Sequence, residues 1–148
     1  MVGMTADATH PPFTAIELDY LAGQRLGRLA TAAPDGTLQV SPVGFAYNAD
    51  TGTIDIGGYT MAASRKFRNV AANGRVAFVV DDIASVQPWR VRCLEIRGRG
   101  EAIVEPTDTA NGPVGPIIRI HPVRIISFGI GDLDTEPHDL VPDSRTVT

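Results

Sequence analysis

The sequence contains a single lysine, a single cysteine and no long hydrophobic run. Its 13 basic residues are twelve arginines and Lys66. The longest apolar stretches, such as residues 76–80, are strand-length and far shorter than the roughly 18 residues that a membrane helix needs. With Cys93 as the only cysteine, an internal disulfide and a cysteine-based zinc site are excluded.

A basic surplus is also missing. The net charge is −4, and residues 132–148 account for all of it with five acidic residues against Arg145, so residues 1–131 are neutral. A nucleic-acid-binding protein normally carries a basic face. The first twelve residues lack the basic start and apolar centre of a secretory signal. We therefore expect a cytoplasmic protein with no nucleic-acid or membrane partner.

The length of 148 residues and the hydrophobic content of 43% suit one compact domain. We expect a flexible arm over residues 1–12 and a single folded domain over residues 13–131. The charged residues 132–148 contain few large apolar groups, so we expect them to be disordered or draped on the surface.

The first half of the chain predicts a helix and three strands. Thr14 and Glu17 have the spacing of a capping box for a helix that ends near Gly23. Strands over residues 26–32 and 38–47 are joined by a Pro-Asp-Gly turn. In the next strand, residues 53–57, isoleucines alternate with Thr53 and Asp55. These strands form a predicted meander.

The second half predicts a helix within residues 61–73, ended by Asn73-Gly74, and then a strand over residues 75–80. Residues 81–90 are rich in turn formers. A long strand over 91–104 contains two glycines, typical of a bulge, and a last strand lies within 117–130. About six antiparallel strands with two short helices predict a mainly β fold, a closed or nearly closed barrel. The glycine pattern does not match a dinucleotide-binding fold.

The strongest local positive charge surrounds Ser64, Arg65 and Lys66, in a segment with no acidic residue. Ser64 is a candidate N-cap, so a phosphate there would meet free backbone N–H groups, the helix dipole and two cations. A solvated basic helix face explains the charge equally well. The use of the only lysine at this point favours the phosphate site.

Other candidate residues each allow two interpretations. Gly57 and Gly58 allow close approach of a planar ligand, or form an ordinary turn. Trp89 is a core residue or a stacking lid, and Cys93 is a small buried apolar residue or a reactive thiol. Pro42 predicts an edge or a bulge in its strand, where unpaired backbone groups can face a ring. The three histidines are far apart in the sequence, and no metal or Ser-His-Asp site is predicted.

These segments, in this order, resemble the pyridoxamine-phosphate-oxidase-like split β-barrel family, in particular its small members that use the deazaflavin F420. The resemblance spans about residues 14–130 and rests on these stretches: LGRLAT at 26–31, PDGTLQV at 34–40, PVGF at 42–45, TIDIGG at 53–58, SRKFRNV at 64–70, VAFVVDD at 76–82, QPWR at 87–90 and RIISFG at 124–129.

The resemblance implies a six-stranded antiparallel split β-barrel that forms a homodimer with two cofactor sites at the interface. Hydride would pass from reduced F420 to an activated C=C or C=N of a small organic substrate such as a polyketide. FMN as the cofactor, or a non-enzymatic F420 carrier, are the alternatives. Ser64, Arg65 and Lys66 would bind the phosphate, and five residues would line the ring and linker: Ser41, Pro42, Val43, Gly57 and Gly58. Trp89 and Arg90 would close the site from the partner subunit. No proton donor is identified.

Overall fold

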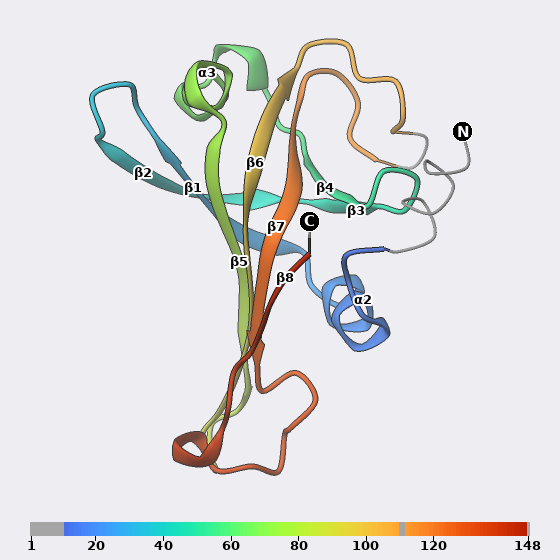
Figure 1. The fold of residues 1–148 in the computed structure, drawn as a ribbon, viewed down its shortest axis with the longest axis vertical. Coiled ribbons are helices and arrows are strands. Elements are labelled where there is room, and N and C mark those ends of the chain that lie inside the picture. Colours follow the sequence, from blue (N-terminus) through green and yellow to red (C-terminus); the bar gives the residue numbers. More distant parts are fainter. Residues whose placement is uncertain (1–10, 110–111, 148) are drawn as a thin grey trace.

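The computed structural model describes residues 11–109 and 112–147, which form one antiparallel sheet curled around an apolar core, with two α-helices at its sides (Figure 1). The elements in chain order are α2 (Ala15–Ala22), β1 (Leu26–Ala32), β2 (Leu38–Gly44), β3 (Ala46–Asn48), β4 (Thr53–Ile56), η1 (Met61–Ala63), α3 (Arg65–Asn73), β5 (Arg75–Ser85), β6 (Arg90–Ile103), β7 (Ile117–Phe128), η2 (Pro137–Asp139) and β8 (Asp143–Thr146). The predicted fold class, a mainly β antiparallel barrel with short helices, is confirmed.

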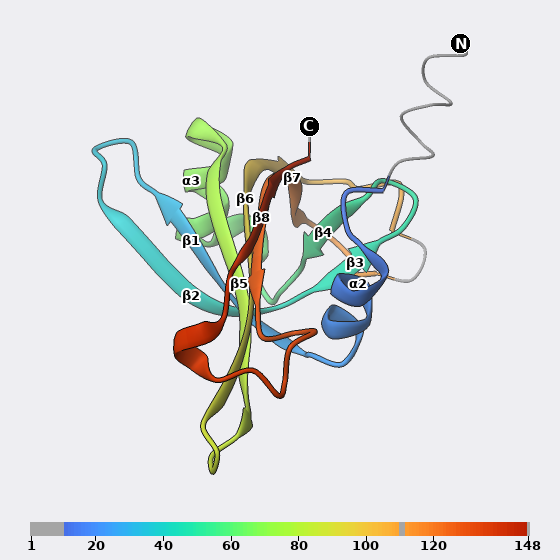
Figure 2. The same cartoon turned by 60° about the horizontal axis from the view of Figure 1, so that its bottom comes forward.

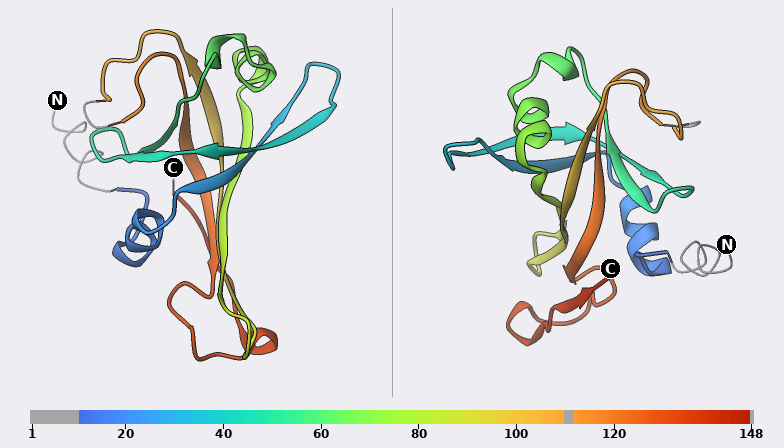
Figure 3. Two further views of the ribbon diagram at one scale, coloured as in Figure 1. Left: turned by 180° about the vertical axis from the view of Figure 1, so that it is seen from behind. Right: turned by 45° about the horizontal axis from the view of Figure 1, so that its top comes forward.

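The sheet curls so that its two terminal strands, β2 and β3, are connected directly by the chain. Its order is β2-β1-β5-β6-β7-β4-β3, and β8 pairs with β7. The terminal strands β2 and β3 are consecutive in the chain and are separated only by Phe45. In the rear view of Figure 3 this part of the chain is one continuous ribbon. The expected single strand over 38–47 is divided at Phe45 into β2 and β3. The two halves pair with β1 and β4, the neighbours that the predicted meander gives them. The described residues form eight strands instead of six.

Both helices begin where their capping residues predict. The backbone N–H of Glu17 donates to Thr14 Oγ1 at 3.2 Å, and Glu17 Oε1 accepts the N–H of Thr14 at 2.9 Å, which completes the capping box. Helix α3 ends at Gly74, whose φ of 68° lies in the left-handed region that favours glycine. These helix ends are confirmed.

Strand β5 is longer than predicted, whereas β6 contains the predicted bulge. Residues 81–85, expected in a turn, extend β5 because they pair with the start of β6. The bulge predicted in β6 is confirmed by a register shift between Arg97 and Gly98. A β-carbon at position 98 would lie 2.3 Å from the carbonyl oxygen of His121, so only glycine fits this bulge.

The C-terminal segment is ordered and attached at two points. Strand β8 runs along β7, as Figure 2 shows, and Arg145 makes an ion pair with buried Glu17 at 2.6 Å. Nearer its start, the carbonyl of Leu133 accepts a hydrogen bond from Arg90 at 2.9 Å. Disorder is therefore the wrong alternative for the described part of the tail.

The predicted division into arm, barrel and tail stays a prediction. Residues 1–10 of the predicted arm lie outside the described residues. In the part of the chain that the structure describes, no helix has the length and apolar character needed to cross a membrane.

Candidate cofactor site

The first turn of α3 presents backbone N–H groups and cations without an acidic neighbour. Ser64 is the N-cap: its Oγ accepts the N–H of Phe67 at 3.2 Å and donates to the carbonyl of Met61 at 2.7 Å. The N–H groups of Arg65 and Lys66 precede the first intrahelical hydrogen bonds and point along the helix axis. Because the Ser64 hydroxyl already has both partners, Ser64 orients this turn and the amides after it are the free donors.

The basic side chains of this turn differ in whether they already have a partner within the described residues. Arg68 donates to the carbonyl of Ala63 at 2.6 Å and so closes the turn. Neither the exposed Arg65 nor the half-buried Lys66 makes an ion pair with any described acidic residue. Two positive charges beside the positive end of the helix dipole give this turn a positive electrostatic potential, which favours anions.

Helix α3 packs on β6 and β1 and is hydrogen-bonded to the edge strand β2. The side-chain amide of Asn69 donates to Gln39 Oε1 at 3.3 Å and to Thr31 Oγ1 at 3.1 Å, which fastens the helix to β2 and β1. Two residues after Gln39, Ser41 faces the same side of the strand. Its Oγ is buried and has no hydrogen-bond partner among the described residues. A buried orphan hydroxyl is uncommon, and a ligand is one group that can satisfy it.

The three predicted lining residues of β2 do not present side chains to one place. Pro42 points to the opposite face from Ser41 and is exposed, and its position in an edge strand is confirmed. Val43 is 6% exposed and belongs to the core, so its side chain packs inside the barrel. Only the backbone of Val43 is available to a ligand.

An open cavity of about 480 Å³ lies beside Gly57 and Gly58. Between β4 and η1 these glycines form one wall, and residues near Phe45 and Pro113 form the others. A β-carbon at position 57 would lie 2.4 Å from Cβ of Pro113, whereas one at position 58 would make only ordinary contact. The group that approaches Gly57 closely is therefore Pro113 of the same chain. The lining residues are Gly44, Phe45, Ala46, Gly57, Gly58, Tyr59, Gly112, Pro113 and Val114.

Tyr59 and Thr60 are features that the sequence did not reveal. The Tyr59 side chain is fully exposed at the cavity. Thr60 has φ of 50° and ψ of 34°, the only positive φ among the described non-glycine residues. A β-branched residue rarely adopts this conformation, so the backbone here is strained. No local sequence signal announces such a turn.

Trp89 and Arg90 lie at the other end of the sheet, on the β5–β6 hairpin at the bottom of Figure 1. Trp89 is 51% exposed, so the core interpretation is wrong. Arg90 is largely buried and donates to Glu136 at 3.1 Å as well as to Leu133. Strand β5 separates the hairpin from α3 by 11 residues, about 35 Å. Within one chain these residues therefore cannot share a ligand with Lys66.

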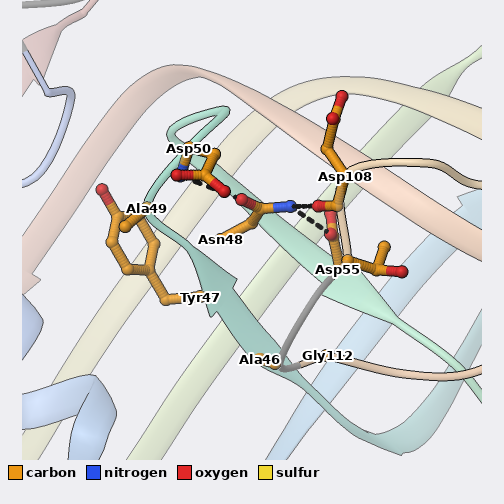
Figure 4. A pocket seen from close by; sticks show the side chains of 9 residues that line it. Ala46, Tyr47, Asn48, Ala49, Asp50, Asp55, Asp108 and Gly112 are labelled. Carbon is orange, nitrogen blue, oxygen red and sulfur yellow. Dashed lines mark hydrogen bonds between the residues drawn. The ribbon is translucent and has the colours of Figure 1, made fainter.

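A second cavity, of about 180 Å³, lies at the end of β4 (Figure 4). Asp55, 1% exposed, accepts Arg119 Nε at 3.0 Å and Nη2 at 3.1 Å, Asn48 Nδ2 at 2.9 Å and Thr53 Oγ1 at 2.9 Å. Asn48 also donates to the carbonyl of Asp108. All four residues of β4 are buried, so its alternating pattern did not mark a solvent face.

The network around Asp55 therefore anchors the segment that follows β6. Asp108 is held through Asn48, and Pro113 of the same β6–β7 connection packs on Gly57. The two cavities are thus linked, because the connection tied down at Asp108 also walls the cavity beside Gly57.

Cys93 is a structural residue. It is half-buried, and burial together with the nearby carboxylates of Asp81 and Glu95 raises the pKa of its thiol to about 11. The reactive thiolate is therefore scarce at neutral pH. The structure favours the interpretation of Cys93 as a small apolar residue.

Comparison with known proteins places these features in a family. The model for "Pyridoxamine 5'-phosphate oxidase" matches residues 15–124. This chain belongs to the pyridoxamine 5'-phosphate oxidase family. The match begins at α2 and runs into β7, and so includes the first turn of α3, both glycines and the β5–β6 hairpin.

One characterised relative is similar in sequence, and two solved structures are similar in fold. A 5a,11a-dehydrotetracycline/5a,11a-dehydrooxytetracycline reductase of Streptomyces rimosus is 47% identical over 131 residues, covering 86% of this chain and 91% of the relative. A conserved hypothetical protein of Mycobacterium tuberculosis superposes with a TM-score of 0.65 at 22% identity, covering 84% of this chain and 89% of the other. A FAD-binding protein of Mycobacterium smegmatis gives 0.60 at 21% identity, with coverages of 78% and 93%. The two structural matches support the fold alone.

Proposed function

We propose that this chain is an F420-dependent reductase that transfers hydride to an activated C=C or C=N of a small organic molecule, a polyketide or similar secondary metabolite. The chain is an oxidoreductase by its family and by its 47% identity to a reductase. That relative's tetracycline substrates supply the model for the substrate class. One observation carries the proposal. The positively charged first turn of α3 lies only a few residues along the chain from the open cavity beside Gly57.

The described residues fit a phosphate-bearing planar cofactor. A volume of about 480 Å³ lies within the usual range for ligand pockets. The Ser41 hydroxyl is buried near the helix that carries the cations and has no hydrogen-bond partner in the part of the chain that the structure describes. Segment 57–64 joins the cavity wall to the N-cap of α3. A cofactor with a ring at one end and a phosphate further along suits this arrangement.

Each proposed residue has a role that its position supports. Lys66, Arg65 and their backbone amides would hold the phosphate, with Ser64 fixing the turn. Ser41 would donate to the cofactor, the backbone of Val43 and the edge at Pro42 would border it, and Gly57 and Gly58 would admit the ring. A reduced deazaflavin supplies the hydride. The protein's contribution is to orient the ring and to exclude water from the reacting carbon.

A homodimer completes this proposal. Leu38 and Val40 on the outer face of β2 are 79% and 69% exposed, and apolar side chains exposed side by side are typical of interfaces. Trp89 and Arg90 are too far from α3 to reach the site of their own chain. In a dimer, Trp89 of one protomer would close the site of its partner, while Arg90 would hold that hairpin against the tail.

Turnover assays test the proposal. Purified protein should oxidise reduced F420 in the presence of cyclic enones, dehydrotetracyclines included, at a rate that depends on both reactants. Turnover with reduced FMN and none with F420 would favour the FMN alternative. Binding of F420 without turnover of any enone or imine would contradict the proposed reaction.

A further inference from the structure

Tyr59 carries the only side-chain hydrogen-bond donor among the described residues that line the cavity beside Gly57. The other lining residues are glycines or apolar residues, so they offer backbone groups and apolar surface. The Tyr59 ring is fully exposed. The phenol is therefore accessible to a ligand that enters the cavity, to which it offers an apolar ring and a polar tip.

The backbone holds Tyr59 in this place. Thr60 adopts a left-handed conformation, and its hydroxyl donates to the carbonyl of Tyr59 at 2.7 Å. Helix η1 begins directly after Thr60 and fixes the chain at that end. Strain of this kind persists only where the surroundings impose it, and it concentrates at functional sites.

We propose that the phenol of Tyr59 is the proton donor to the carbonyl oxygen of an α,β-unsaturated ketone in this cavity. This inference rests on the proposed function. Hydride from the reduced deazaflavin forms a C–H bond at the β-carbon, and the C=C electron pair shifts toward the carbonyl. The carbonyl oxygen takes the Tyr59 proton to give an enol, which tautomerises to the saturated ketone. Solvent returns a proton to the tyrosine oxygen.

The substitution that tests this role is Tyr59→Phe, which removes one oxygen and keeps the ring. We expect kcat for a cyclic enone to fall about 100-fold, the usual effect of removing a proton donor or an oxyanion donor. Affinity for F420 and KM for the enone should change little. Tyr47→Phe is the matched control, since Tyr47 packs edge-on against Phe13 at 5.5 Å and does not line this cavity.

A spectroscopic measurement separates this role from ring stacking. With oxidised F420 and 2-cyclohexen-1-one labelled with ¹³C at the carbonyl, the bound C=O stretch should lie at lower frequency in the wild type than in Tyr59→Phe. Hydrogen bonding weakens the C=O bond, whereas stacking leaves it unchanged. Equal frequencies and equal kcat in the two proteins would overturn the role of Tyr59 alone. A wild type that reduces no enone with F420 would overturn the proposed function and this inference with it.

Discussion

Gly57 and Pro113 touch so closely that a β-carbon at position 57 would lie 2.4 Å from Cβ of Pro113. We therefore expect Gly57→Ala to displace the connection between β6 and β7 and to destabilise the protein by about 1–3 kcal/mol. Urea unfolding without cofactor measures this change. The control is Gly23→Ala, where the added β-carbon would lie 3.7 Å from its nearest neighbour, the carbonyl oxygen of Tyr20. Equal stability of the two variants would contradict the packing described here.

Lys66→Ala tests the anion-binding turn. Loss of one charge-assisted contact should weaken F420 binding by about 1–3 kcal/mol, while the midpoint of thermal unfolding stays within a few degrees. Arg75→Ala removes an exposed cation at the opposite end of α3 and should leave the affinity unchanged. Binding isotherms for the three proteins decide the matter. An unchanged affinity in Lys66→Ala would refute the phosphate assignment.

Asp55→Asn tests the buried network around Asp55. The substitution leaves Arg119, 7% exposed, without its countercharge, so we expect a loss of about 3–5 kcal/mol of stability. Asp19→Asn changes an exposed carboxylate outside any described ion pair and should cost only a few tenths of a kcal/mol. Chemical unfolding of both variants checks this. A mild effect in Asp55→Asn would mean that Asn48 and Thr53 hold the connection without the ion pair.

The Glu17–Arg145 ion pair predicts a loss of stability in acid. Burial by itself raises the pKa of Glu17, but hydrogen bonds from Arg145 and from the backbone of Thr14 outweigh it and hold the pKa below 4.5. Because the folded pKa is the lower one, the stabilisation is fully present above the unfolded pKa and disappears as the pH falls through the folded pKa.

The comparison between wild type and Glu17→Gln isolates this contribution. The wild type should be the more stable protein at pH 7, and the difference should shrink steadily below about pH 4.5. Unfolding free energies measured from pH 3 to 7 give the result. A difference that does not vary with pH would show that Glu17 acts by packing and not by charge.

Local features of the sequence predicted local structure well. Ser64 and Gly74 bound α3 because capping depends on residues three or four positions apart. The bulge at Gly98 was predictable for the same reason. Pro42 at a sheet edge followed from its missing N–H.

Features that depend on distant partners were not predictable. The break at Phe45 depends on how the whole sheet curls, since β2 lies at one end of the strand order and β3 at the other. Strand β8 has no apolar pattern, and its order comes from β7 and from Glu17, 128 residues away in the sequence. The burial of Asp55 likewise depends on Arg119, 64 residues away in the sequence.

The central claim is that the cavity beside Gly57 and the first turn of α3 together bind F420. Fluorescence titration of the purified wild-type protein with F420, and separately with FMN, tests it most directly. We predict saturable F420 binding at least about ten-fold tighter than FMN binding, which corresponds to 1.4 kcal/mol or more. Tight FMN binding with no binding of F420 would contradict the account.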